Sequence, residues 1–241
     1  MFVCPNRSEV HLRDALKRST YVLDFDGVIV HRFTQFIDFI SARKELAKVM
    51  IERGFNIDLI RSYIDPYDLI KLCYGEWGIH KDFQLFSKIL EEYELVALHR
   101  VVTDLRAKEF LEILISNGKE VYISSLQPNT VISFIISRLG IPTDKVRICG
   151  RDAGGRPKPY TDQLVGVEGD DAVVLGDSCT DGYLARNLGS YFIGLSTNGY
   201  TEYELCSVDA VAVFNDLEEL LEFLLREVLK LGESQFRRDY R

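Results

Sequence analysis

The chain has 241 residues, of which 46% are hydrophobic and 27% charged, so it has enough apolar material for a core and is not intrinsically disordered. Its formal net charge of −8 argues against nucleic acid or an anionic membrane surface as the main partner. No apolar run reaches the roughly 18 residues of a transmembrane helix, and the N-terminus lacks the apolar block of a secretory signal, so a cytoplasmic protein is expected.

Short apolar runs predict buried strands, and amphipathic stretches predict the helices between them. A strand at 21–25 comes first, and the residues from about 34 to 100 are predicted to form helices only. A further helix begins near Asp104 and ends at Gly118. Five more strands are predicted at 120–124, 145–149, 172–177, 191–196 and 210–214. The helices among them are predicted at 128–140, within 160–171 (a short one), at about 180–188, and from Asn215 to about Leu231.

This alternation predicts an α/β fold with a parallel sheet covered by helices on both faces, which is a three-layer Rossmann-like core. Residues 36–99 interrupt the pattern, because a crossover between parallel strands needs only one helix. We therefore expect residues 1–35 and 100–241 to form the core. Residues 36–99 are expected to form a small all-helical domain inserted after the first strand, with Trp77, the only tryptophan, in its interior.

The five cysteines are odd in number and widely spaced: Cys4, Cys73, Cys149, Cys179 and Cys206. They include no CxxC pair and no Cys/His spacing typical of zinc ligands. We therefore expect neither a structural zinc site nor a disulfide framework, in keeping with a reducing compartment.

The first candidate site is the segment from Asp24 to Gly27, at the end of an apolar strand. Alternation along a strand places Asp24 and Asp26 on the same side, where two carboxylates repel each other unless a cation lies between them. Magnesium suits this position, because it prefers oxygen ligands. The alternative is a simple strand-to-turn boundary, for which Asp-Gly is a common pair.

A second acidic segment, Gly176 to Asp181, also follows an apolar strand. Ligands of parallel α/β sheets collect at the carboxyl ends of the strands, so Asp177 could bind the same cation from a neighbouring strand. The alternative is helix capping, because Asp, Ser and Thr are all good N-cap residues.

Two further segments could bind phosphate. Ser124 and Ser125 end a strand, where a hydroxyl and the N–H groups that follow suit a phosphate oxygen. The loop from Gly155 to Pro159 carries two cations, Arg156 and Lys158, between prolines that stiffen the backbone. The alternatives are a serine that merely ends a strand and a solvated surface cation.

In this order, all at strand ends, the four segments resemble the four motifs of the haloacid dehalogenase (HAD) superfamily, and the pairing of DFDGV with GDSCTD is the specific part. The resemblance covers about 20–35 and 100–215, is phosphoglycolate phosphatase-like, and makes the helical insertion similar to the family's cap domain. It implies a magnesium-dependent phosphatase that hydrolyses a small phosphorylated metabolite through an aspartyl-phosphate.

The resemblance also implies roles for single residues. Asp24 would be the nucleophile and Asp26 the general acid and base, while Ser124 and Lys158 would bind the transferred phosphoryl group. Magnesium would be held by Asp24, Asp26 (through its carbonyl), Asp177 and, directly or through water, Asp181. Gly27, Ser125, Arg32 and Arg156 are the further substrate-binding candidates.

Several alternatives stay open. The family's third motif often reads Lys-Pro-x-Pro, which aligns its lysine with Arg156, but Lys158-Pro159 also satisfies it and carries the usual amine. Arg32 could meet a carboxylate or a second phosphate of the substrate. The rival functions are a phosphomutase of the same fold and a catalytically silent phospho-ligand-binding or regulatory protein. The sequence leaves a monomer and a homodimer equally open.

Overall fold

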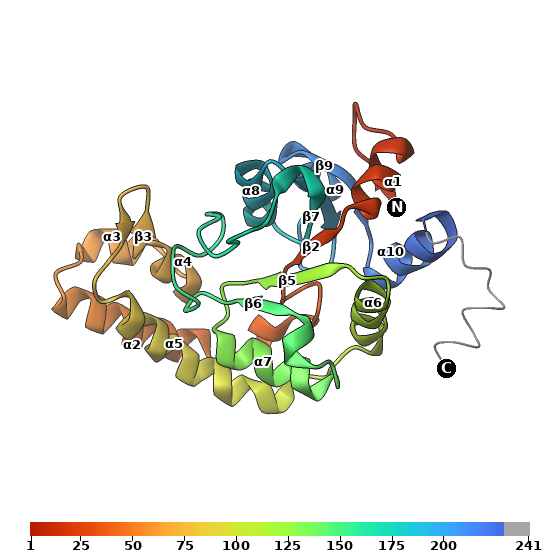
Figure 1. Ribbon diagram of the computed structural model, residues 1–241. Helices are drawn as coiled ribbons and strands as arrows, with labels where there is room; N and C mark the ends of the chain where they lie inside the picture. Colours follow the sequence, from red (N-terminus) through yellow and green to blue (C-terminus); the bar gives the residue numbers. More distant parts are fainter. Residues whose placement is uncertain (229–241) are drawn as a thin grey trace.

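The computed structural model describes residues 1–228, and its centre is a seven-stranded sheet in the order β1-β9-β8-β7-β2-β5-β6 (Figure 1). The strands are β1 (Phe2–Val3), β2 (Thr20–Leu23), β5 (Glu120–Ser124), β6 (Arg147–Cys149), β7 (Ala172–Gly176), β8 (Tyr191–Leu195) and β9 (Ala210–Phe214). All neighbouring strands in the part of the sheet ordered β9-β8-β7-β2-β5-β6 pair in parallel, which confirms the α/β prediction. The short edge strand β1 was not predicted, and it pairs antiparallel with β9.

Helices cover both faces of the sheet, as the three-layer prediction requires. One face packs against α1 (Glu9–Lys17), α6 (Leu105–Ser116), α7 (Asn129–Arg138) and α10 (Leu217–Phe223). The other packs against α8 (Cys179–Leu188) and α9 (Glu202–Ser207). Alternation along β2 sends Tyr21 and Leu23 into the first layer and Val22 into the second, because successive strand side chains point to opposite faces.

Helix ends follow local chemistry, with small departures from the prediction. The Asp104 carboxylate accepts a hydrogen bond from the Arg106 N–H and starts α6 as expected. Helix α10 starts one residue later than predicted, because Asp216 rather than Asn215 accepts the bond that caps it. Its predicted end at Leu231 lies outside the described residues. Between 160 and 171 the structure has only a 3₁₀ turn, Gly169–Asp171, instead of a short helix.

Most of the helical insertion (residues 36–99) lies at one end of the molecule, and its last helix runs from there alongside α7 (Figure 1). Its helices are α2 (Phe39–Glu52), α3 (Ile57–Ser62), α4 (Pro66–Lys71) and α5 (Phe83–Ala97). It is not entirely helical, because β3 (Tyr74–Gly75) and β4 (Gly78–Ile79) form a small antiparallel hairpin. Trp77 occupies the turn of this hairpin and is 100% exposed. The expectation of an interior Trp77 is therefore wrong, because the residue lies in an exposed turn and not on the packed face of a helix.

The cysteine prediction also needs correction, because Cys4 and Cys206 form a disulfide. Cys4 follows β1 and donates its N–H to Val211 of β9, while Cys206 lies on α9, the helix that precedes β9. The two residues are 202 positions apart, and only the pairing of β1 with β9 brings them together. Within residues 1–228, no helix has both the length and the apolar character needed to cross a membrane.

Candidate active site

The four candidate segments meet at one edge of the sheet. Strand β2 lies between β5 and β7, so the residues that follow these strands become neighbours. The register aligns Leu23 with both Ile123 and Leu175, and the Asp24 N–H donates to the Leu175 carbonyl at 2.8 Å. Parallel pairing therefore brings Asp24 next to Ser124 on one side and to the Asp177 segment on the other.

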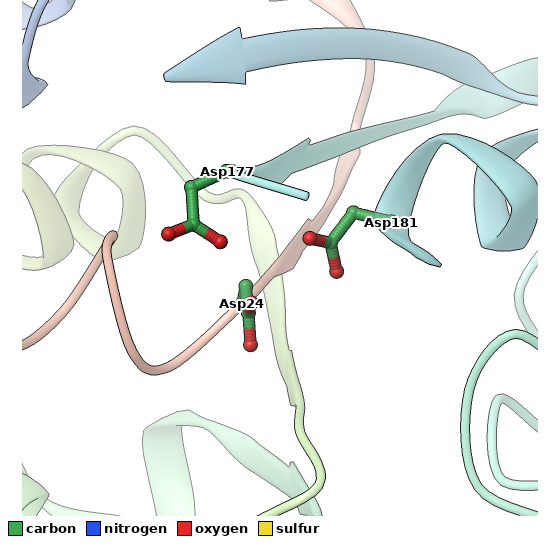
Figure 2. A group of neighbouring side chains, drawn as sticks. All are labelled: Asp24, Asp177 and Asp181. Carbon is green, nitrogen blue, oxygen red and sulfur yellow. The ribbon is translucent and has the colours of Figure 1, made fainter. Parts of the chain in front are cut away.

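Three buried carboxylates converge at this edge (Figure 2). Asp24 follows β2, Asp177 follows β7, and Asp181 lies in the first turn of α8; each offers one oxygen within 4.8 Å of the other two. Asp181 is oriented by Ser178, whose N–H and hydroxyl donate to its Oδ2 at 3.1 and 2.6 Å. The strand-to-helix turn thus serves both functions that the sequence left open, since it starts the helix and presents carboxylates.

Lys158 is the cation at this site. Its Nζ lies 2.6 Å from Asp24 Oδ1 and 2.7 Å from Asp181 Oδ1, and the residue is 4% exposed. Arg156 points elsewhere: its guanidinium pairs with Asp162 at 2.8 Å and lies 4.1 Å from the Tyr160 ring centroid. The geometry therefore places Lys158, and not Arg156, against the candidate nucleophile.

Negative charge exceeds positive charge here. Burial raises the pKa of Asp24 to about 7, with Asp181 adding to this effect and Lys158 opposing it. Burial, followed by the charges of Asp24 and Asp181, raises the pKa of Asp177 to about 9. Within the described chain, Asp177 Oδ2 is buried without a hydrogen-bond partner. An orphaned carboxylate oxygen beside two others is a donor set that fits a divalent cation such as magnesium.

Gly27 makes room for this cluster. Its φ of +89° is unfavourable for other residues, and a Cβ at this position would collide with the Asp177 carboxylate and lie 2.8 Å from Asn198 Nδ2. Its carbonyl accepts a hydrogen bond from the Thr197 hydroxyl at 2.8 Å. We did not predict Thr197, although it follows β8 at the same edge, where the strand-end rule would have found it.

Asp26 is not one of the three clustered carboxylates, although it is near enough for its charge to help raise the pKa of Asp177. Strand β2 ends at Leu23, so the alternation that was expected to align Asp26 with Asp24 does not continue. The Asp26 side chain instead accepts hydrogen bonds from the N–H groups of Phe33 and Thr34, at 2.7 and 3.1 Å. The Asp26 carboxylate is therefore oriented by the turn that follows the first motif, and it is not one of the three grouped carboxylates.

The remaining candidates differ in their surroundings. Ser124 is buried at the end of β5, and no described residue hydrogen-bonds its hydroxyl. The Ser125 hydroxyl is engaged by the Gln127 side chain. Arg32 is exposed, and within residues 1–228 its guanidinium has no ion-pair partner, whereas His31 beside it contacts Asp104 at 2.9 Å. Ser124 and Arg32 thus keep polar groups available for a ligand.

Comparison with known proteins yields one curated relative and many solved structures of the same fold. The chain is 28% identical to a phosphoglycolate phosphatase from Rhodospirillum rubrum over 84% of this chain and 89% of the relative. A hydrolase from Pseudomonas syringae has a TM-score of 0.64 at 21% identity, covering 89% and 99% of the two chains. A HAD-family hydrolase from Deinococcus radiodurans, solved with phosphate and sodium, has a TM-score of 0.55 at 22% identity, covering 88% and 96%.

No protein-family model matches the chain. The relative nevertheless spans most of both sequences, and the solved structures share the sheet and the flanking helices. Their fold is the one that the four strand-end motifs indicated. On this combined basis, the chain has the fold of haloacid dehalogenase-like hydrolases, and its sequence is similar to that of a phosphoglycolate phosphatase.

Proposed function

We propose that the protein is a magnesium-dependent phosphatase that hydrolyses a small phosphorylated metabolite through an aspartyl-phosphate on Asp24. The observation that carries this proposal is the convergence of Asp24, Asp177 and Asp181 at the carboxyl ends of the strands, with Lys158 in contact with Asp24 and Asp181. Asp24, Asp177 and the Asp26 carbonyl would hold magnesium, with Asp181 in support. The metal would supply positive charge that lowers the repulsion between a carboxylate nucleophile and an anionic phosphate.

The chain's own residues account for both halves of the reaction. In the first half, an Asp24 oxygen forms a bond to phosphorus while the bond to the leaving oxygen breaks, and Asp26 protonates that oxygen. In the second half, Asp26 removes a proton from water, whose oxygen attacks phosphorus and releases inorganic phosphate from Asp24. Lys158 and the Ser124 hydroxyl bind the equatorial phosphoryl oxygens, where negative charge accumulates.

The substrate proposal comes from the relative and from Arg32. Phosphoglycolate, named in the relative's activity, carries a carboxylate next to its phosphate ester. Arg32 follows the first motif and has an unpaired guanidinium within the described chain, so we assign it to such a carboxylate. We further propose that residues 36–99 act as the cap that covers the bound substrate, with 1–35 and 100–241 as the catalytic core. A cytoplasmic location stays a prediction.

The test is hydrolysis of a generic aryl phosphate and of a panel of phosphorylated metabolites by the purified protein with magnesium. Asp24→Asn should abolish turnover, because an amide is not a nucleophile of this kind. Asp216→Asn is the matched control, since Asn caps a helix as well as Asp does. Robust hydrolysis by Asp24→Asn would disprove the proposed nucleophile. Transfer of phosphate to a substrate isomer instead of water would identify a phosphomutase.

A further inference from the structure

A second group of buried charges lies away from the acidic cluster. Arg151, in the loop after β6, and Glu94, on α5 of the helical insertion, are both 0% exposed in their side chains. Arg151 Nη1 and Nη2 contact Glu94 Oε1 and Oε2, each at 2.7 Å, in a bidentate pair. Burying these two charges away from water costs free energy. The reaction proposed above uses neither residue, so the pair needs another explanation.

Every donor direction of Arg151 is used, and the partners come from both parts of the molecule. Its Nε donates to the Ser87 hydroxyl and its Nη2 to the Ser87 carbonyl, both at 2.8 Å. Its Nη1 also donates to the Leu126 carbonyl at 2.8 Å. Ser87 lies on α5, whereas Leu126 lies in the loop after β5. One guanidinium therefore connects the insertion to the loop that follows Ser124.

The same loop is reached by a second route. Tyr67, on α4 of the insertion, donates its hydroxyl to Glu94 at 2.6 Å and accepts from Gln127 Nε2 at 3.2 Å. The Gln127 side chain accepts from the Ser125 hydroxyl, and the Gln127 carbonyl accepts from the Arg151 N–H at 3.1 Å. The chain of buried polar groups ends at Ser125, whose N–H donates to the Cys149 carbonyl at 3.1 Å.

We propose that the Arg151 network (Tyr67, Ser87, Glu94, Ser125, Gln127 and Arg151) is a positioning device that holds the loop after β5, and with it Ser124, in register with Asp24. Buried polar networks restrict geometry, because each member that loses its partner is left unsatisfied in a low-dielectric interior. The network also ties the position of α4 and α5 to this loop. This inference rests on the proposed function in assigning Ser124 to the phosphoryl group.

The sharpest variant is Tyr67→Phe, which removes one hydroxyl and leaves the ion pair in place. We expect kcat for aryl phosphate to fall about tenfold with little change in KM, because a displaced Ser124 affects the transition state more than initial binding. Hydrogen exchange should accelerate in peptides that cover 124–129. Tyr93→Phe is the matched control: Tyr93 lies on α5 and donates to Glu45 at 2.6 Å, entirely within the insertion.

A second variant removes the charges together. Arg151→Met combined with Glu94→Leu should keep the insertion packed, since apolar replacements of buried ion pairs are often tolerated, and it should still show the loss in kcat and faster exchange at 124–129. Wild-type kcat and wild-type exchange in both Tyr67→Phe and the double variant would overturn the proposal. If the wild-type protein hydrolyses nothing, the proposed function fails. The exchange measurement, with and without inorganic phosphate, then still tests the positioning.

Discussion

The molecule buries charge in two places, and the two are built differently. Around Asp24, three carboxylates lie together, the Lys158 ammonium group contacts only Asp24 and Asp181, and Asp177 Oδ2 has no partner within the described chain. At Arg151 and Glu94, one positive charge meets one negative charge in a bidentate pair, and Ser87, Leu126 and Tyr67 satisfy the remaining polar atoms.

The difference is the one expected between a site that is built to bind a ligand and a contact that holds the fold. The unbalanced cluster lacks positive charge, and binding a cation would supply it. The balanced pair needs nothing further, and any change to one member leaves the other uncompensated. An excess of buried charge at the carboxyl end of a strand therefore favours a catalytic or ligand-binding site. A matched pair of buried charges between two parts of the chain favours a role in holding those parts in position.

The largest expected effect is a loss of kcat on substitution of Lys158, at the acidic cluster. Lys158→Ala should lower kcat by about 1,000-fold, because removing a preorganised charge next to the reacting phosphoryl group is among the most damaging changes to an active site. Arg156→Ala should lower it by no more than a few fold, since Arg156 pairs with Asp162 away from Asp24. Steady-state kinetics with aryl phosphate compares the two. A severe effect in Arg156→Ala alone would reassign the third motif.

At the Arg151–Glu94 pair, Glu94→Gln should lower the free energy of unfolding by about 3 kcal/mol, because the Arg151 charge stays buried without its counter-ion. Urea denaturation followed by circular dichroism measures this. Arg151→Met combined with Glu94→Leu should recover most of the loss. If Glu94→Gln is as stable as the wild type, Arg151 and Glu94 are not the balanced pair described above.

Gly27→Ala tests whether the cluster needs the room beside Asp177. We expect at least a 100-fold fall in kcat/KM, because the added methyl group would displace the Asp177 carboxylate. Gly54→Ala is the matched control: its φ of +92° is similar, but no atom lies within 4 Å of the added Cβ. Both variants carry the same backbone strain, so equal activity losses would contradict an effect specific to the cluster.

The smallest expected effect is the dependence of metal stabilisation on pH. The folded-state pKa of Asp177 is raised from 3.8 to about 9, so without metal its contribution to stability is present below about pH 4 and is lost as the pH rises towards 9. In the proposed function, magnesium would bind the ionised carboxylates. Magnesium should therefore raise Tm more at about pH 8 than at about pH 5. At saturating metal, the added free energy of unfolding should be about 2 kcal/mol larger at the higher pH.

Thermal scans with and without magnesium at both pH values measure this difference. Asp177→Asn should remove most of the magnesium effect at the higher pH. An equal effect of magnesium at both pH values would mean that the carboxylates are already ionised without metal. The cluster would then not differ from the Arg151–Glu94 pair by an excess of buried negative charge.

The sequence predicted six of the seven strands of the main sheet (β2, β5, β6, β7, β8 and β9), because each is a short apolar run and local hydrophobicity decides whether a run is buried. It missed β1, which has only two residues and depends on its partner β9. It also misplaced Trp77 in the interior, because burial of one side chain depends on what packs above it. The two-residue strands of the hairpin are too short to give a periodic signal.

By itself, the sequence determined the order of buried strands and the polar residues that end them, because both properties are local. Only the tertiary structure decided which of those residues meet. The position of β2 between β5 and β7 brought Asp24 and Asp177 together, and the loop between β6 and β7 placed Lys158 against Asp24, while the Asp26 side chain bonds to the Phe33 N–H. The partnerships Arg151–Glu94 and Cys4–Cys206 likewise depend on packing between elements far apart in the chain, for which residue type and spacing carry no signal.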